Sequence, residues 1–147
     1  MAGLLKLSEA VSLGLHATVI LAANHDGPCT ARRLAERLRA SEAHLAKVMQ
    51  RLVKAGLVLS TRGPRGGFVL AAPPEEISLL QVYEAIEGPV EPTGCVFGVP
   101  VCDRETCIFG GFVSEFENRF RAYLANTRLS ELSEPAAQPK ESVDARP

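Results

Sequence analysis

Two short runs of strand-forming residues, separated by a loop of glycine, proline and arginine, constrain the fold of this chain most. The first run is 57–61 (Leu-Val-Leu-Ser-Thr) and the second is 68–71 (Phe-Val-Leu-Ala), with Arg-Gly-Pro-Arg-Gly-Gly at 62–67 between them. Two such runs around a turn-forming loop predict a β-hairpin. The rest of the chain has a helical pattern, so we expect a mainly α fold with one small β-hairpin.

Helical segments precede the hairpin. Apolar residues recur at helical spacing over 6–23. Thr30 is a suitable N-cap for a short helix, and Ser41 for a second helix over 42–55 that Gly56 ends. Two helices joined by a tight turn and followed by a hairpin predict a winged helix-turn-helix. The predicted buried face of the second helix consists of Leu45, Val48, Met49 and Leu52.

A different part of the chain follows the hairpin. An amphipathic helix is predicted over 77–87, and 88–111 is a loop rich in glycine and proline. Aromatic residues at spacings of three and four then predict a long helix to about Thr127. We interpret this aromatic stripe as a dimerisation seam that packs against a partner and the N-terminal helix. The stripe consists of Phe109, Phe112, Phe116, Phe120 and Tyr123.

From Ser130 onward the composition becomes polar and contains proline, which is typical of disorder. We therefore divide the chain into three parts. Residues 1–74 are predicted to form the winged helix-turn-helix, 75–129 the connecting helix, the cysteine loop and the dimerisation helix, and 130–147 a disordered tail.

Charge is distributed unevenly along the chain. Of the 16 Lys and Arg residues nine lie between Pro28 and Gly67, whereas only two of the 17 Asp and Glu residues lie there. A basic segment joined to an acidic remainder is the asymmetry expected of a nucleic-acid binder. A basic but merely solvated helical face is the alternative, and the coincidence with the winged-helix pattern favours DNA binding.

The first turns of the second helix in this motif enter the major groove. Ser and His side chains can hydrogen-bond to base edges, and Glu can accept from cytosine N4. Ser41 as a cap alone and His44 as a plain surface residue are the alternatives. Arginines on the flexible hairpin loop suit minor-groove or phosphate contacts. The predicted DNA-binding residues are Thr30, Ser41, Glu42, Ala43, His44, Lys47, Arg51, Arg62 and Arg65.

Three cysteines, Cys95, Cys102 and Cys107, lie close together in the glycine- and proline-rich loop. Thiolates hold iron–sulfur clusters, and a loop can wrap around the inorganic core. Structural zinc favours Cys-x-x-Cys pairs, which this sequence lacks. A redox disulfide between two of the three, or thiols without a role, are further alternatives. Cys29 lies in another element and is expected to be a small packed residue or a bystander without a role.

The segment 55–71, Ala-Gly-Leu-Val-Leu-Ser-Thr-Arg-Gly-Pro-Arg-Gly-Gly-Phe-Val-Leu-Ala, resembles the wing of the IscR/NsrR/CymR regulators, the Rrf2 family. The order of elements is similar as well, over roughly residues 4–130. The resemblance implies a bacterial homodimeric transcription regulator that binds a double-stranded DNA operator. It also implies an iron–sulfur cluster, [2Fe–2S] or [4Fe–4S], on Cys95, Cys102 and Cys107.

This sequence departs from the family pattern in the cysteine loop. Six residues separate the first two cysteines and four separate the second two, whereas relatives usually space them evenly. No His follows Cys107 to serve as a fourth ligand. Some relatives borrow a ligand from the first helix of the partner subunit, where Glu9 and His16 are the candidates here. Other relatives carry no cluster and respond to partner proteins or small molecules.

The remaining function classes are disfavoured by the sequence. It has no nucleophile–base pairing, phosphate-binding loop or paired-acid motif, so we expect no enzyme. No targeting or membrane-spanning segment is visible, so we expect a cytoplasmic protein with reduced thiols and no membrane partner. The predicted function is a regulator, in the simplest case a repressor, that senses redox, iron–sulfur or nitric oxide status. The alternative is a cluster-free regulator that responds to thiol oxidation, a partner or a metabolite.

Overall fold

The structure is a computed structural model that describes residues 5–103 and 105–133. Its regular elements are mostly helices, with one antiparallel hairpin, so the predicted fold class is confirmed. In chain order they are α1 (Glu9–Ala23), α2 (Ala31–Leu38), α3 (Glu42–Lys54), β1 (Val58–Thr61), β2 (Gly67–Leu70), the 3₁₀ helix η1 (Pro74–Glu76), α4 (Leu79–Glu87), α5 (Phe112–Asn126) and α6 (Leu129–Leu132).

The first three helices begin at hydroxyl caps. The side chains of Ser8, Thr30 and Ser41 each accept a hydrogen bond from the backbone N–H three residues later, at 3.2, 3.1 and 3.3 Å. Such caps satisfy N–H groups that have no partner within the helix. The caps predicted at Thr30 and Ser41 are therefore confirmed. The prediction that the first helix starts at Lys6 is wrong by three residues, because Ser8 caps a helix that begins at Glu9.

The core lies where α1 crosses α3 and α4. A Cβ atom added to Gly14 of α1 would lie 2.2 Å from Cδ1 of Ile86 on α4, so any larger residue there would displace the Ile86 side chain. The predicted face of α3 is buried, since each of its four apolar side chains is at most 2% exposed. Burial of each such side chain stabilises the fold by roughly 1.5–3 kcal/mol. These four side chains are Leu45, Val48, Met49 and Leu52.

The hairpin is joined to the segment before α2. Strands β1 and β2 pair antiparallel, with Val58 opposite Leu70. Cys29 adds a short bridge to the hairpin, because its N–H donates to Phe68 O at 3.0 Å and its carbonyl accepts from Phe68 N at 2.8 Å. A Cβ on the neighbouring Gly67 would lie 2.7 Å from the Cys29 carbonyl, so glycine is required there. Cys29 itself is 2% exposed, which confirms the prediction of a packed residue.

The C-terminal helices are fastened to the start of α4. Ser78 caps α4 and forms a reciprocal capping box with Gln81. On the other side of this turn, Leu129 N donates to Ile77 O at 2.9 Å, and the Leu129 side chain is fully buried. The prediction that disorder begins at Ser130 is therefore wrong for residues 130–132, which continue α6 because Leu129 anchors it. The rest of the predicted tail, 134–147, lies outside the described residues.

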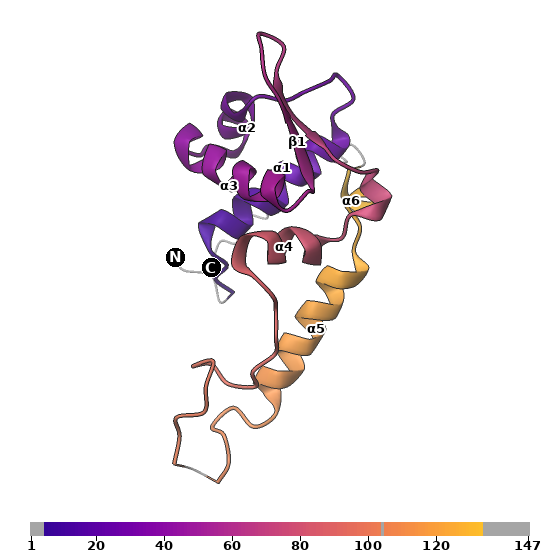
Figure 1. The fold of residues 1–147 in the computed structure, drawn as a ribbon. Coiled ribbons are helices and arrows are strands. Elements are labelled where there is room, and N and C mark those ends of the chain that lie inside the picture. The colour runs from indigo at the N-terminus through magenta and orange to yellow at the C-terminus, as the bar shows by residue number, and fades with distance from the viewer. Residues whose placement is uncertain (1–4, 104, 134–147) are drawn as a thin grey trace, which may run out of the picture.

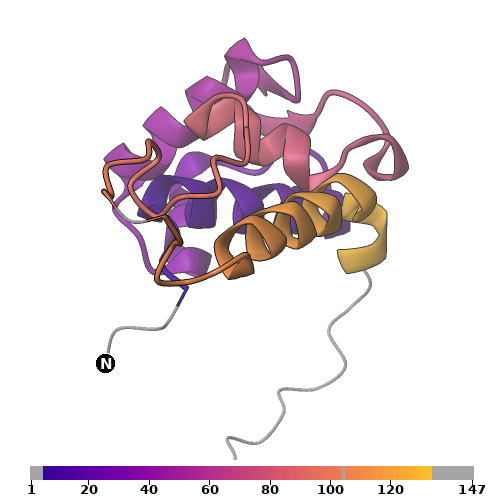
Figure 2. The ribbon, with the colours of Figure 1, turned by 90° about the horizontal axis from the view of Figure 1, so that it is seen from below.

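The molecule is elongated along α5. Figure 1 shows the tip of the hairpin at one end of the described chain and the loop of residues 88–111, which we call the cysteine loop, at the opposite end. Seen from below, α5 and the cysteine loop lie in front of the other helices (Figure 2). Helix α5 buries only Leu124, whereas Phe112, Phe116 and Tyr123 are 65, 43 and 57% exposed. Across the described ranges, no helix has the length and apolarity that a bilayer crossing requires.

Candidate DNA-binding head and cysteine loop

The start of α3 presents an exposed row of predicted DNA-binding residues. Ser41 is exposed, and its hydroxyl oxygen already accepts a hydrogen bond from His44 N at 3.3 Å. The next exposed positions are Glu42, Ala43 and Lys47. The cap role of Ser41 is thus shown, and its hydroxyl proton remains free to donate. The base contacts of these residues stay predictions.

The side chain of His44 contacts another helix of the chain. Its Nδ1 lies 3.7 Å from Oε1 of Glu9, on the first turn of α1, and the two side chains are 37 and 70% exposed. Glu9 was predicted as a candidate ligand for a cluster and His44 as a DNA contact. Within one chain the structure brings these two residues together, and they form an ion pair when the imidazole is protonated.

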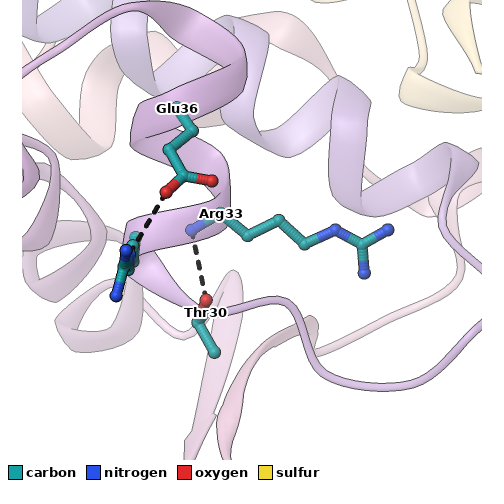
Figure 3. Close-up of polar contacts among 4 residues, drawn as sticks. Thr30, Arg33 and Glu36 are labelled. Carbon is teal, nitrogen blue, oxygen red and sulfur yellow. Dashed lines mark hydrogen bonds and ion pairs between the residues drawn. The ribbon is translucent and has the colours of Figure 1, made fainter.

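Helix α2 contributes exposed cations near its start. Figure 3 shows the Thr30 side chain capping Arg33 N and, one turn further, the Glu36 carboxylate in an ion pair with Arg32 at 3.1 Å. The Arg33 side chain extends away from Glu36 in the same view. Cys29 directly precedes the Thr30 cap of α2. Burial raises the pKa of its thiol, and the guanidinium groups of Arg33 and Arg37 only partly oppose the rise. Cys29 is therefore a weakly reactive thiol in the folded chain.

The hairpin loop carries the two predicted wing arginines. Arg62 and Arg65 are exposed. The loop between the strands is closed by backbone and hydroxyl contacts, with Gly66 N donating to Gly63 O at 2.9 Å and Thr61 Oγ1 to Gly67 O at 3.3 Å. Within the described chain neither arginine forms an ion pair. Both guanidinium groups are therefore available to a polyanion.

Arg51 occupies a different place from the other predicted DNA contacts. Its Nη1 donates to the carbonyl oxygen of Ile86, in the last turn of α4, at 3.3 Å. A hollow of about 420 Å³ lies beside this contact, between the C-terminal turns of α3 and α4. The structure therefore assigns Arg51 a contact that joins α3 to α4. A DNA contact for Arg51 stays a prediction.

The three loop cysteines gather around one hollow. Cys95, Cys102 and Cys107 line a depression of about 240 Å³ together with Thr93, Gly94 and Pro100. Cys95 is partly buried, whereas Cys102 and Cys107 are exposed, and all three thiols are free. The predicted grouping of the three cysteines therefore exists in the folded chain.

Two of these cysteines open similar turns. The tetrapeptides Cys-Val-Phe-Gly at 95–98 and Cys-Ile-Phe-Gly at 107–110 each close with the glycine N–H donating to the cysteine carbonyl, at 3.0 and 2.9 Å. Phe109 N also donates to Cys107 Sγ at 3.4 Å, and Cys95 Sγ donates to Val99 O at 3.4 Å. Reasoning from the sequence missed this short repeat, although the two tetrapeptides are visible in it.

In the described part of the loop, the cysteine hollow offers thiol donors and lacks the close grouping of side chains that one metal ion needs. Among the described residues, no three His, Cys, Asp or Glu side chains converge closely enough to hold a single metal ion. Three thiols around a hollow, one of which accepts a backbone hydrogen bond, are nevertheless the donor chemistry of an iron–sulfur cluster, which is larger than one ion. The three thiols therefore fit as ligands of such a cluster, which needs a fourth ligand as well.

The candidate fourth ligands lie elsewhere in the chain. Neither Glu9 nor His16 is among the residues that line the cysteine hollow. His16 Nδ1 lies 2.6 Å from Ser12 O, one turn earlier on α1. His16 also borders an apolar groove of about 440 Å³ with Leu15 and Val19 among its lining residues. A ligand from the first helix of a partner subunit stays a prediction.

Comparisons with known proteins agree with this arrangement. Residues 7–135 match the family model Rrf2, described as iron-dependent transcriptional regulator. The HTH-type transcriptional regulator IscR of Aliivibrio salmonicida is 33% identical over 108 residues, which are 73% of this chain and 64% of that protein. BadM of Rhodopseudomonas palustris is 39% identical over 83 residues, 56% of this chain. The matched part spans 53% of BadM and 38% of YwgB of Bacillus subtilis, so the chain covers about half the length of such relatives or less.

Solved structures show the same fold. CymR of B. subtilis, described as the global cysteine regulator, superposes with a TM-score of 0.73 at 29% identity, covering 88% of this chain and 97% of that chain. The oxidized form of Staphylococcus aureus CymR gives 0.70 at 27% identity, covering 91 and 100%. IscR of T. potens gives 0.67 at 25% identity, covering 87 and 85%. With a family model matched over most of its length, this chain belongs to the Rrf2 family.

Proposed function

We propose that this chain is a homodimeric, DNA-binding transcription regulator that senses redox or iron–sulfur status. The sensor is an iron–sulfur cluster held by Cys95, Cys102 and Cys107. One observation carries the proposal: the three thiols line a single hollow. The loop that holds them lies at the end of the molecule opposite the hairpin tip (Figure 1). The chemistry and the readout thus occupy separate places in one chain, as a switch requires.

The loop residues have distinct roles toward the cluster. A bound cluster supplies a redox-active and oxidant-sensitive centre. The three thiolates hold it, and the Phe109 N–H that donates to Cys107 Sγ at 3.4 Å stabilises negative charge on that sulfur. Hydrogen bonds to cluster sulfurs are one of the factors that set the reduction potential. Because free thiols persist in reducing compartments, we propose a cytoplasmic location.

The head supplies DNA recognition. The first turn of α3, with Ser41, Glu42 and His44, is proposed to read base edges in the major groove. The wing arginines, Arg62 and Arg65, are proposed to contact phosphates or the minor groove, because they are exposed and free of ion pairs within the described residues. Salt dependence of binding then follows from the phosphates that these side chains neutralise.

A second copy is proposed to cover the aromatic face of α5. Phe112, Phe116 and Tyr123 are largely exposed in the single chain. The cysteine loop also exposes Phe97 and Ile108, at 66 and 69%. Exposed apolar residues gathered on one helix face are typical of a protein interface. A dimer would place two recognition helices about 34–36 Å apart, which matches successive major grooves.

A route from the cysteine loop to the head runs through α4. The loop follows directly after α4, and Arg51 of the recognition helix is bonded to Ile86 in the last turn of α4. We propose that the state of the loop shifts the population of head arrangements instead of touching DNA. Coupling energies of this kind are about 1–3 kcal/mol, which corresponds to about 5–150-fold in operator affinity.

Two measurements test this function. Protein purified without oxygen is expected to be brown, with broad visible absorption and with iron and sulfide in similar amounts. Operator titrations at one fixed salt concentration are expected to show affinities of the cluster-bound and cluster-free protein that differ by about 5–150-fold. Equal affinities for every operator tried would remove the sensing role and leave a DNA-binding protein with a structural cluster.

A cluster-free thiol regulator is the second candidate. The exposure of Cys102 and Cys107, and the similarity to CymR, which is described as a global cysteine regulator and has an oxidized form, favour it. Its signature would be a colourless, iron-free protein. Operator affinity would then change on treatment with an oxidant and return on treatment with a thiol reductant.

A further inference from the structure

The entrance of the cysteine loop is held at both backbone groups of Val90. Its N–H donates to Oε1 of Glu84 on α4 at 3.0 Å, and its carbonyl accepts from Nε of Arg121 on α5 at 3.2 Å. These contacts fix the point at which the chain leaves α4. They also bring the following residues alongside the middle of α5.

Glu117, one turn before Arg121 on α5, holds the next part of the loop. Its Oε2 accepts from Gly94 N at 2.8 Å, and its Oε1 accepts from the Thr93 hydroxyl at 3.3 Å. A carboxylate that accepts a backbone N–H forms a charge-assisted hydrogen bond, which is stronger than a neutral one. Glu117 is half-buried, so water screens these bonds less than on an open surface.

The loop lies close to α5 at residue 94, where the backbone conformation favours glycine. Gly94 has φ +69°, a left-handed conformation that favours glycine. A Cβ atom at this position would lie 2.7 Å from Oγ of Ser114, which is on the same face of α5 as Glu117. Backbone conformation, close approach and the Glu117 bonds therefore all place the Thr93–Gly94 turn on α5.

Thr93 links the backbone of Cys95 to Glu117 by hydrogen bonds. Its hydroxyl oxygen accepts from Cys95 N at 3.3 Å and lies 3.0 Å from Cys95 O. The single hydroxyl proton serves either the Cys95 carbonyl or Glu117 at any moment, so the two acceptors share it. The backbone of Cys95 is thereby tied to α5 through one intervening side chain.

The other two cysteines have no comparable attachment. In the described part of the loop, no side chain of α4 or α5 bonds to the segments around Cys102 and Cys107. Cys95 is partly buried, whereas Cys102 and Cys107 are exposed. Among the described residues, a side chain of α5 therefore holds the loop near Cys95, whereas Cys107 is placed only by backbone turns that lead into α5.

We propose that Glu117 is the positioning residue that fixes Cys95 against α5, so that Cys95 is the preformed anchor of the triad. Cys102 and Cys107 then close on this anchor when the loop takes up its ligand. Glu117 also attaches the loop to α5, the helix whose aromatic face is proposed to meet the second copy. The cluster-related part of this inference rests on the proposed function, whereas the anchoring of Cys95 does not.

Alkylation of the three thiols in cluster-free protein tests the anchoring. Iodoacetamide labelling followed by peptide mass spectrometry measures a separate rate for each cysteine. Glu117→Ala is expected to raise the rate at Cys95 by about five- to tenfold, because loss of the acceptor leaves the Gly94 N–H without its partner. The rates at Cys102 and Cys107 are expected to stay unchanged.

Two matched variants complete the experiment. Glu117→Gln keeps an acceptor oxygen for Gly94 N and is expected to restore most of the protection of Cys95. Glu115→Ala removes a carboxylate from the opposite side of α5, where it forms an ion pair with Arg119 at 3.9 Å, and is expected to change none of the three rates. A Gln variant that behaves like Ala at Cys95 alone would show that the hold needs the charge, which also supports the proposal.

Two outcomes would overturn the inference. The first is a Cys95 rate that is the same in the wild type and in Glu117→Ala. The second is an equal rise at all three cysteines, because this would indicate general loosening of α5 instead of release of one anchor. A wild-type protein that takes up no iron or sulfide would refute the proposed cofactor without affecting this test, since the labelling is done without a cluster.

Discussion

The carboxylate of Glu9 lies 3.7 Å from the imidazole of His44, and this contact joins the first turn of α1 to the first turn of the recognition helix. When the imidazole is protonated the two groups form an ion pair, which we expect to orient His44. An exposed pair of this kind contributes up to about 1 kcal/mol. The pair joins a predicted DNA contact to a predicted candidate ligand of the cluster.

Removing the carboxylate tests that orientation. Glu9→Gln is expected to lower the ratio of specific to non-specific DNA affinity by about fivefold or less, because His44 loses its partner. Fluorescence anisotropy with operator and random duplexes at one salt concentration measures the ratio. Glu36→Gln, which also removes a negative charge from the head, serves as the control. An equal change in both variants would indicate a general charge effect.

The wing predicts a change in salt dependence. Replacing Arg62 and Arg65 by Ala is expected to weaken operator binding and to lower the salt slope by up to about two units per half-site, if both contact phosphate. Replacing both by Lys keeps the charges and should keep most of the slope. Titrations across a range of salt concentrations measure it. A slope unaffected by the Ala changes would rule out the wing as a phosphate contact.

Three of the four cysteines are expected to be needed for the cluster, and the fourth is not. Single Ser replacements of Cys95, Cys102 and Cys107 are each expected to bleach or destabilise the cluster, because one iron loses its thiolate. Visible absorbance and iron content of protein purified without oxygen measure this. Cys29→Ser is expected to leave the spectrum intact, because that thiol is buried beside the hairpin. If Cys29 proves equally necessary, the three-cysteine site is wrong.

Burial of Cys29 predicts a pH dependence of stability. Burial raises the pKa of this thiol above its ordinary value of 9.0, so the folded state keeps the proton longer than the unfolded state does. The free energy of unfolding should therefore fall as pH rises above 9.0, by at most about 1.4 kcal/mol per pH unit from this group. Urea unfolding from pH 8 to 10 measures the trend. Cys29→Ala should flatten it, and an identical slope in that variant would contradict the prediction.

The aromatic face of α5 predicts the oligomeric state. Phe116→Glu places a charge in the proposed interface and is expected to shift the protein from dimer to monomer, since burial of one such ring contributes roughly 1.5–3 kcal/mol. Sedimentation velocity at micromolar concentration measures the shift. Asn118→Glu puts the same charge on another side of α5 and should leave the dimer intact. A wild-type protein that sediments as a monomer would refute the interface.

Much of the fold was predictable because its signals are local. Thr30 and Ser41 are hydroxyl caps placed directly before helical spacing, and both form the expected bonds. The hairpin followed from two strand-forming runs around a glycine-rich loop. The tail was predicted less well, because α6 persists through the burial of Leu129 against the start of α4, which composition does not reveal.

Local pattern in the sequence by itself determined the helices, the wing and the presence of three thiols in one loop, because caps, spacing and turn residues act over a few positions. The tertiary structure decided which side chains meet. Arg51 reaches Ile86 across 35 positions, and Gly94 reaches Glu117 across 23. Such contacts depend on how α1, α3, α4 and α5 are packed by the core. A residue's role as a DNA contact, a link between helices or an anchor for a cysteine is therefore settled by packing, not by its neighbours in the chain.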